Sequence, residues 1–169
     1  MFNSKGFSLL EILVTLFILS ILLSLAIPSY RIFLHQSQDK IMRETLFRAI
    51  HLARSEAMSR GEAVSLGKNG KSWEQGIILF VDQKEDGSVE NAEQIIVRFD
   101  AAKRRGVLHW RSALGREYLR MLPSGIAEEN AAFWFCAEGE SQSVWGVMIN
   151  QAGKARLANN AEMKLFPCA

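Results

Sequence analysis

One long apolar run dominates the first part of the chain. From Leu9 to Ile27 there are 19 residues, and the only charged one among them is Glu11. As an α-helix rising about 1.5 Å per residue, this run would be roughly 28 Å long, which matches the apolar core of a bilayer. A cleavable secretory signal usually has a shorter apolar region followed by a small-residue cleavage site. We therefore expect the run to be a retained transmembrane helix.

The hydrophobic pattern changes at Pro28. Residues 29–60 contain no Gly or Pro, and their apolar residues recur at three- and four-residue steps. The members of this stripe are Met42, Leu46, Ile50, Ala53 and Ala57. Such a stripe predicts an amphipathic helix packed on a core, and Gly61 is placed to end it as a C-terminal cap. The two helices are expected to form one rod that is interrupted or bent at Pro28.

The sequence becomes rich in β-forming residues after Gly61. Short apolar and aromatic runs are separated by turn signals such as Asp86-Gly87. The strands expected from them are residues 63–66, 76–81, 94–99, 107–111, 118–122, 131–136 and 144–150. Several short strands after a long helix predict an α+β fold, in which the helix covers one face of an antiparallel sheet.

The charge of the chain is unevenly distributed. The net charge of +2 decides little about partners, but residues 98–120 carry seven basic residues against two acidic ones, a net charge of +5. The basic residues are Arg98, Lys103, Arg104, Arg105, Arg111, Arg116 and Arg120. Two interpretations stay open: the segment extends a surface for an anionic partner, or it faces acids of a neighbouring subunit.

Both cysteines follow the apolar run. Lys5 in the short N-terminal flank predicts that the N-terminus stays in the cytoplasm. Everything after Pro28 would then lie in an oxidising compartment, where Cys136 and Cys168 are expected to form a disulfide. The bridge would close a loop of about 30 residues and stabilise the fold by about 3 kcal/mol. The alternative is a pair of buried free thiols.

The carboxylate of Glu11 needs a compensating charge. On insertion scales, the free-energy cost of an acid at the centre of a membrane helix is about 2.5–3.5 kcal/mol, and the cost is lower near the interface. A cation supplied after insertion would offset this cost, either a lysine or the amino terminus of a neighbouring chain. Glu11 lies five residues after Gly6, so a cut after Gly6 would create an amine at Phe7 that a neighbour's Glu11 could reach.

The motif KGFSLLE at residues 5–11, followed by the apolar run and Pro28, resembles the class III signal of type IV pilins and type II secretion pseudopilins. The resemblance implies cleavage between Gly6 and Phe7 by prepilin peptidase and N-methylation of Phe7. It also implies that Glu11 acts in subunit assembly through the neighbouring N-terminal amine.

This resemblance sets the expected domains and location of the protein. Residues 1–6 would be the leader peptide, 7–28 the transmembrane and assembly helix, 29–61 its amphipathic continuation, and 62–169 a β-rich periplasmic head domain with a C-terminal tail. The protein would first be a single-pass inner membrane protein with a periplasmic head. It would then become part of a pilus or pseudopilus filament.

The rest of the chain narrows the family. Residues 52–57 (LARSEA), residues 73–82 (WEQGIILFVD) and Asp86-Gly87 resemble the FimT/GspH minor pilin and pseudopilin domain, so the resemblance covers nearly the whole chain. It implies a type IV pilin-like α+β fold, with the long N-terminal helix packed on an antiparallel β-sheet head. The implied partners are other pilin or pseudopilin subunits.

The C-terminal part is most similar to FimT/FimU-type minor pilins. Residues 133–136 (FWFC), residues 153–157 (GKARL) and Cys168 resemble a tail in which a Gly-Arg-x-Arg motif is associated with DNA binding. In this chain, Lys154 stands at the position of the first Arg of the motif. Lysine keeps the positive charge but lacks the guanidinium group that can form two parallel hydrogen bonds. The resemblance implies that Lys154 and Arg156 bind double-stranded DNA without sequence specificity during natural transformation. The alternative is a solvated hairpin beside the disulfide.

Two alternatives to a type IV minor pilin stay open. One is a GspH-like minor pseudopilin of the tip complex of a type II secretion system. The other is a generic binding module held by a single membrane anchor. Detection of processing between Gly6 and Phe7 separates this last alternative from the other two, since only a pilin-class signal is cut there.

Other candidate chemistry is weak. The tryptophans Trp73, Trp110, Trp134 and Trp145 are expected in the core rather than in a base-stacking platform. The three histidines have no Cys or acid at metal-ligand spacing, and Glu128-Glu129 lies next to a turn in what we interpret as an open loop. With no nucleophile-elbow serine and no glycine-rich phosphate loop, we expect no enzyme activity, no cofactor and no metal site.

Overall fold

The computed structural model describes residues 8–89, 94–100 and 106–168, without the side chains of residues 25–29, 31 and 74. The processing residues Gly6 and Phe7 lie outside the described residues, as do Lys103, Arg104 and Arg105 of the basic segment. The chain divides into two compact units, residues 1–38 and residues 39–169. The domain boundaries expected at residues 28 and 61 stay predictions.

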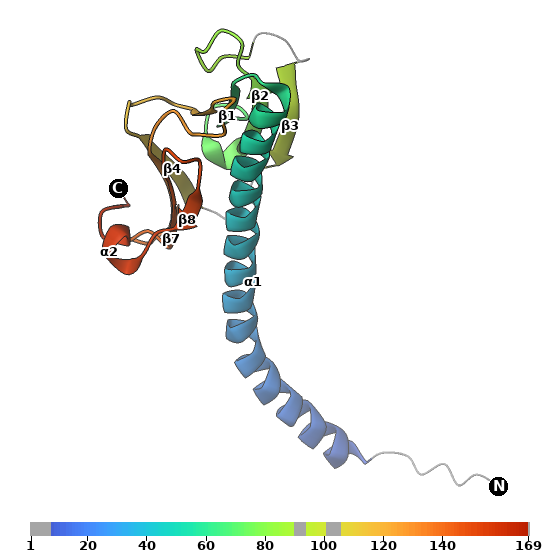
Figure 1. Cartoon of the computed structure of the whole chain (residues 1–169). Helices are drawn as coiled ribbons and strands as arrows, with labels where there is room; N and C mark the ends of the chain where they lie inside the picture. The colour runs from blue at the N-terminus through green and yellow to red at the C-terminus, as the bar shows by residue number, and fades with distance from the viewer. Residues whose placement is uncertain (1–7, 90–93, 101–105, 169) are drawn as a thin grey trace, which may run out of the picture. The chain divides into compact units, whose positions relative to one another are not determined.

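Helix α1 spans Leu9–Arg60 (Figure 1). Ser8 caps its first turn, because the Ser8 hydroxyl oxygen accepts a hydrogen bond from the backbone N–H of Glu11 at 3.2 Å. Within the first unit, the hydroxyl groups of Thr15, Ser20 and Ser24 each donate to the backbone carbonyl three residues earlier. These bonds satisfy the few polar side chains of the apolar run locally. The backbone is helical through residue 28, so the helix is not interrupted there.

In the part of the chain that the structure describes, no helix combines the length and the apolar character that a membrane crossing needs. The transmembrane helix expected from residues 7–28 therefore stays a prediction.

In the second unit, the C-terminal part of α1 packs on two antiparallel sheets. The first sheet has the order β3-β2-β1-β5, and the second has the order β4-β6-β7-β8. The strands of the first sheet are β1 (Val64–Lys68), β2 (Gly76–Val81), β3 (Ile95–Asp100) and β5 (Leu119–Met121). Those of the second are β4 (Gly106–Ser112), β6 (Ala131–Ala137), β7 (Trp145–Ile149) and β8 (Ala155–Leu157). Figure 1 shows β1, β2 and β3 beside the last turns of α1.

The predicted helix stripe is confirmed. Met42, Leu46, Ile50, Ala53 and Ala57 are all buried, and the last three are fully inaccessible to solvent. They form one hydrophobic cluster with residues of both sheets, including Leu66 of β1 and Phe133 of β6. The small side chains of Ala53 and Ala57 allow the helix backbone to approach the sheets closely.

The predicted fold class is confirmed, and all seven predicted strands are present with shifts of one or two residues at some ends. Three short elements were not predicted: the 3-10 helix η1 (Trp73–Gln75), the strand β8 and the helix α2 (Asn160–Met163). The sequence also predicted one sheet where the structure has two. Strand pairing depends on contacts between distant segments, which the alternation within each strand does not encode.

Of the four tryptophans expected in the core, Trp73 and Trp145 are buried, and Trp110 is half-buried and packs against the core. The expectation is wrong for Trp134, which is half-buried and does not belong to the core cluster. The Trp73 ring lies edge-on to Phe133 at 4.8 Å between ring centroids and packs against Trp110 at 5.4 Å. Such aromatic contacts stabilise a core beyond the area that they bury. Trp73 therefore joins η1 to the second sheet rather than serving as a platform for bases.

Candidate assembly and partner-binding sites

Glu11 lies in the first turn of α1 and is exposed to solvent. Ser8 and Glu11 have the spacing of a capping box. One of its two hydrogen bonds is present, from the backbone N–H of Glu11 to the Ser8 hydroxyl oxygen. The positive end of the helix dipole favours an acid there by about 0.3–1 kcal/mol. The sequence-based interpretation of Glu11 as an acid in a membrane did not include this stabilisation of its charge by the helix N-terminus. No ion pair of the described residues includes Glu11.

The helix around Glu11 exposes a large apolar surface. The large apolar side chains from Leu9 to Leu23 are each at least 46% exposed, and Leu9 reaches 78%. Contiguous apolar surface of this extent mostly marks a site for protein association or for a membrane. This part of α1 is therefore a candidate surface for association with another chain or with lipid.

At the other end of the chain, Cys136 and Cys168 form a disulfide with their Cα atoms 5.7 Å apart, as the sequence predicts. The bridge holds the C-terminal tail on the face of β6 that points away from the core. On that face the Trp134 ring stacks on His109 at 5.1 Å and on Phe166 at 5.0 Å between centroids. The Trp134 indole N–H also donates to the Pro167 carbonyl at 3.3 Å. Trp134 therefore anchors the tail.

Lys154 and Arg156 lie in different environments. Lys154 is exposed in the turn between β7 and β8, and its backbone N–H donates to the side-chain oxygen of Asn150 at 3.0 Å. Arg156 lies on β8, where its guanidinium donates two hydrogen bonds to the Glu162 carboxylate at 2.8 and 2.5 Å. A third bond, at 3.2 Å, goes to the Leu157 carbonyl. Of the two basic residues of this hairpin, Arg156 has an ion pair among the described residues and Lys154 does not.

Glu162 connects Arg156 to the tail. Its carboxylate accepts the backbone N–H of Asn159, while the Asn159 side chain accepts the backbone N–H of Glu162, which is a complete capping box at the start of α2. The hydrogen bonds from Arg156 and from Asn159 lower the pKa of Glu162 to about 2. The same contact with Glu162 raises the pKa of Arg156 above its ordinary value. The ion pair between Arg156 and Glu162 thus connects α2 to β8.

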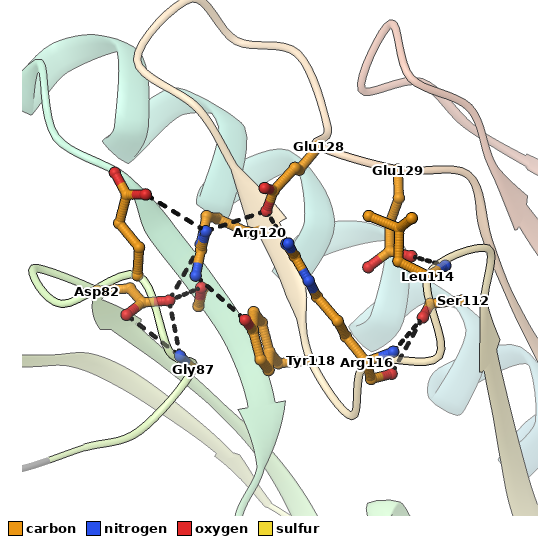
Figure 2. Close-up of polar contacts among 11 residues, drawn as sticks. Asp82, Gly87, Ser112, Leu114, Arg116, Tyr118, Arg120, Glu128 and Glu129 are labelled. Carbon is orange, nitrogen blue, oxygen red and sulfur yellow. Dashed lines mark hydrogen bonds and ion pairs between the residues drawn. The ribbon is translucent and has the colours of Figure 1, made fainter.

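Two of the four described arginines of the basic segment, Arg116 and Arg120, form ion pairs within the head. Arg120 on β5 and Asp82 after β2 are each only 2% exposed, and the Arg120 Nε donates to the Asp82 carboxylate at 3.2 Å. One terminal nitrogen of Arg120 donates to Glu128 at 3.1 Å, and the other donates to the Tyr118 hydroxyl at 3.1 Å. Figure 2 shows Arg120 at the centre of these contacts. We call Arg120, Asp82, Glu128 and Tyr118 the Arg120 cluster.

The contacts of the Arg120 cluster continue on both sides. Asp82 also accepts the Ser65 hydroxyl at 2.7 Å and the backbone N–H of Gly87 at 3.1 Å. Glu128 also forms an ion pair with Arg116, and this contact raises the pKa of Arg116 (Figure 2). Buried charges are tolerated only when they are paired and hydrogen-bonded in this way.

The sequence interpretation of Glu128-Glu129 as an open acidic loop is wrong. Glu129 is 2% exposed, and its carboxylate accepts the backbone N–H of Leu114 at 2.6 Å. Glu128 bridges two arginines. The one usable signal in the sequence was Arg120 itself, which stands between Leu119 and Met121 in a short strand. Of the basic segment, Arg98 and Arg111 are the described residues that stay exposed.

The Arg120 cluster has a structural arrangement rather than a reactive one. Together with Arg116, its charges are two arginines against the carboxylates of Asp82 and Glu128, and the cluster joins β2, β5 and the segment around Glu128. Among residues 8–89, 94–100 and 106–168, no three His, Cys, Asp or Glu side chains are grouped so that they could hold a metal ion. Among the described residues, groups that a partner could contact include the apolar surface around Glu11 and exposed cations of the head such as Lys154.

Comparisons with protein families match both parts of the chain. The family described as type II transport protein GspH matches residues 43–153, which is more than half of the chain. The prokaryotic N-terminal methylation motif matches residues 1–27. No curated protein sequence gives a significant match.

Solved structures of two related types have a similar fold. The type IV minor pilin FimU of Pseudomonas aeruginosa is 22% identical, with a TM-score of 0.60 over 76% of this chain and 94% of that chain. The minor pseudopilin EpsH from the type II secretion system of Vibrio cholerae is 16% identical, with a TM-score of 0.52 over 72% of this chain and 93% of that chain. At these identities the likeness shows the fold alone, which is the predicted type IV pilin-like fold.

Proposed function

Because the chain belongs to the GspH family of type II transport proteins, and is thus a minor pilin or pseudopilin, we propose that it is a minor pilin of a type IV pilus. It is incorporated into the filament, or primes it, through its N-terminal helix. The observation that carries this proposal is the apolar surface of α1 from Leu9 to Leu23, which the isolated chain leaves exposed.

The proposed maturation gives that surface two successive environments. Prepilin peptidase cuts between Gly6 and Phe7, and Phe7 is N-methylated. The apolar helix first anchors the chain in the inner membrane with the head in the periplasm, and it then packs among other pilin subunits in the filament core. In both places water is excluded from the apolar side chains, which is the driving force for their burial.

The proposed role of Glu11 is to pair with the amine of a neighbouring subunit. Its exposure in the first turn of α1 and the lack of an ion-pair partner among the described residues support this role. Away from water an unpaired carboxylate is costly, so an amine supplied by the neighbour would favour assembly over the membrane-bound state.

Substitution of Glu11 tests this role. Glu11→Gln keeps the shape of the side chain and removes its charge, so we expect the amount of the protein in sheared filaments to fall about 10-fold. Its amount in membranes, and the mass of the chain cut before Phe7, should not change. Glu44→Gln on the exposed side of α1 is the control and should assemble normally. Equal assembly of both variants would exclude the proposed role of Glu11.

The choice of a pilus over a secretion system is supported by the tail. The FWFC strand, the GKARL segment and the disulfide to Cys168 together resemble the FimT-type tail. A deletion strain should therefore lose surface pili and twitching motility while it still secretes its extracellular enzymes. Loss of secretion with normal pili would assign the chain to a secretion pseudopilus instead.

DNA binding at the C-terminal hairpin is the finer part of the proposal. It is supported by the exposed amine of Lys154, which can neutralise a phosphate. Arg156 is a weaker candidate, because its guanidinium must give up two hydrogen bonds to Glu162 before it can bind a phosphate. We therefore place the phosphate contact at Lys154 rather than at both residues.

A further inference from the structure

Arg54 is a cation that the described head does not pair. It lies on the C-terminal part of α1, its side chain is half-buried, and its Nε is buried without a hydrogen-bond partner. None of the ion pairs found among the described residues includes it. A buried donor of a charged group that has lost water and gained no acceptor is destabilising.

Four other arginines of the same unit, Arg60, Arg116, Arg120 and Arg156, each contact at least one carboxylate. Among the described residues, no ion pair gives Arg54 such a partner. A second molecule can therefore supply the acceptor that the Arg54 Nε lacks.

Two glycine turns lie directly against Arg54. A Cβ on Gly125 would be 3.3 Å from the Arg54 Nε, and a Cβ on Gly153 would be 3.5 Å from the Arg54 Cδ. Both glycines have positive φ angles, +78° and +70°, which other residues rarely adopt. The turns therefore approach Arg54 with backbone only, and neither glycine covers its guanidinium with a side chain.

The neighbours of Arg54 include two glycine turns and Met58. The Met58 sulfur lies 2.6 Å from the position of a Cβ on Gly125, and Met58 is 50% exposed. Ile126 follows Gly125 in the chain and is 44% exposed. We call Arg54, Met58, Gly125, Ile126 and Gly153 the Arg54 surface. It contains one cation, two exposed large apolar side chains and no acid.

We propose that the Arg54 surface docks a carboxylate-bearing segment of a neighbouring filament subunit. The Arg54 guanidinium receives the carboxylate, and Met58 and Ile126 pack against an apolar side chain beside it. An arginine next to exposed apolar side chains is typical of the residues that dominate protein interfaces. Interfaces with DNA are more polar and more strongly basic, so the apolar half of this surface favours a protein partner. The inference rests on the proposed function, because it takes the partner from the same filament.

Photo-crosslinking in cells that produce the whole filament tests this docking with the full chain. A photoreactive residue is placed at Met58 or at Ile126, and the crosslinked partner peptide is identified by mass spectrometry. We expect a peptide of another pilin subunit that contains Asp or Glu. Arg54→Glu should reduce the crosslink yield at least about 10-fold, because like charges then oppose each other. Reversal of the partner acid to Arg should restore it.

Two further variants control for position and folding. Arg48→Glu lies six residues earlier, on a different side of α1, and should leave the crosslink unchanged. Arg54→Met removes the unpaired N–H and keeps a long side chain, so we expect loss of the crosslink with no decrease in the melting temperature. A lower melting temperature of Arg54→Met would assign Arg54 a structural role and overturn the proposal.

A second photoreactive position, Leu13, separates failure of this inference from failure of the proposed function. If crosslinks from Leu13 to other subunits persist while those from Met58 ignore Arg54→Glu, the docking proposal alone is wrong. If crosslinks from Leu13 are absent too, the proposed filament assembly is wrong, and the docking proposal falls with it. Crosslinks from Met58 to nucleic acid in place of a subunit would also overturn the proposal.

Discussion

At the scale of single residues, some basic side chains of the head are buried and paired, whereas others are exposed to solvent. Arg120 is buried and hydrogen-bonded to three side chains, while Lys154 is exposed and belongs to no ion pair of the described residues. Nothing in the composition separates these residues, because both belong to basic stretches of the sequence. Burial decides the role, since a buried charge must be matched inside the fold while an exposed one is free for a partner.

Breaking the Arg120–Asp82 pair should destabilise the head strongly. Asp82→Asn removes the carboxylate that accepts from the Arg120 Nε and leaves Glu128 as the remaining close acid, so we expect the free energy of unfolding to fall by about 1.5–3 kcal/mol. Thermal unfolding of the full-length protein in detergent, followed by near-UV circular dichroism, measures this change. Glu85→Gln is the matched control, because Glu85 lies 3.8 Å from Arg120 but is 69% exposed. A small change in both variants would show that the pair is dispensable.

The Arg156–Glu162 contact should make docking of the tail depend on pH. The pKa of Glu162 is lowered from 4.5 to about 2 in the fold, so the stabilisation is fully present above pH 4.5 and is lost as pH falls toward 2. Hydrogen exchange of the amides of residues 159–163 should therefore accelerate over that range. Glu162→Gln should remove this acid-dependent acceleration, while Glu140→Gln should retain it. Acceleration that persists in Glu162→Gln would place the titrating group elsewhere.

At the scale of elements, the C-terminal tail is an addition to the second sheet. Its short helix α2 has no buried residue of its own, so it depends on its attachments. These are the disulfide, the contact between Arg156 and Glu162, and the stack of Phe166 on Trp134. A four-residue helix is not stable alone, because a few backbone hydrogen bonds do not offset the entropy of ordering it.

Removing the disulfide should therefore release the tail more than the head. The bridge joins residues that are 32 positions apart, and a loop of this size corresponds to about 3–4 kcal/mol in the chain-entropy description. In the double variant Cys136→Ser, Cys168→Ser we expect the melting temperature to fall. Limited proteolysis should cut after residue 157 while residues 39–150 stay protected. A tail equally protected with and without the bridge would show that packing alone holds it.

At the scale of the whole molecule, the two units of the chain carry different kinds of surface. The apolar part of α1 suits lipid or the filament core, whereas the head carries the cations that a partner outside the core can reach. Membership of the GspH family fixes the first role in general terms. The second role depends on surface charges, which a shared fold does not determine.

DNA binding is the prediction for the whole molecule that these charges allow. If Lys154 contacts a phosphate, Lys154→Ala should reduce the slope of log affinity against log salt concentration for double-stranded DNA by about 1. Arg156→Ala should change this slope less, because Arg156 is already paired with Glu162. Fluorescence anisotropy of the full-length protein in detergent over a salt series measures both. Identical slopes for wild type and Lys154→Ala would exclude the phosphate contact at Lys154.

The sequence alone determined the features that depend on local pattern. The period of the apolar residues predicted the helix face with Leu46 and Ala53, and the alternation predicted seven strands. The motif around Glu11 resembled that of the pilin class, and the match to the N-terminal methylation motif supports this resemblance. These follow from the backbone geometry of helices and strands and from a short contiguous motif. The residues that make up each such pattern lie close together in the sequence, so the pattern can be recognised without knowledge of the tertiary structure.

Only the tertiary structure decided which charges meet. Asp82 and Arg120 are 38 residues apart and Arg120 and Glu128 are separated by a turn, yet all three share one cluster. Arg54 lies against glycines of two turns that come 71 and 99 residues later in the chain. The energy of an ion pair depends on distance and burial, which arise only when the sheets and α1 pack together. That packing pairs Arg156 with Glu162 of the same chain. It leaves the Arg54 Nε without an acceptor among the described residues, which a partner can supply.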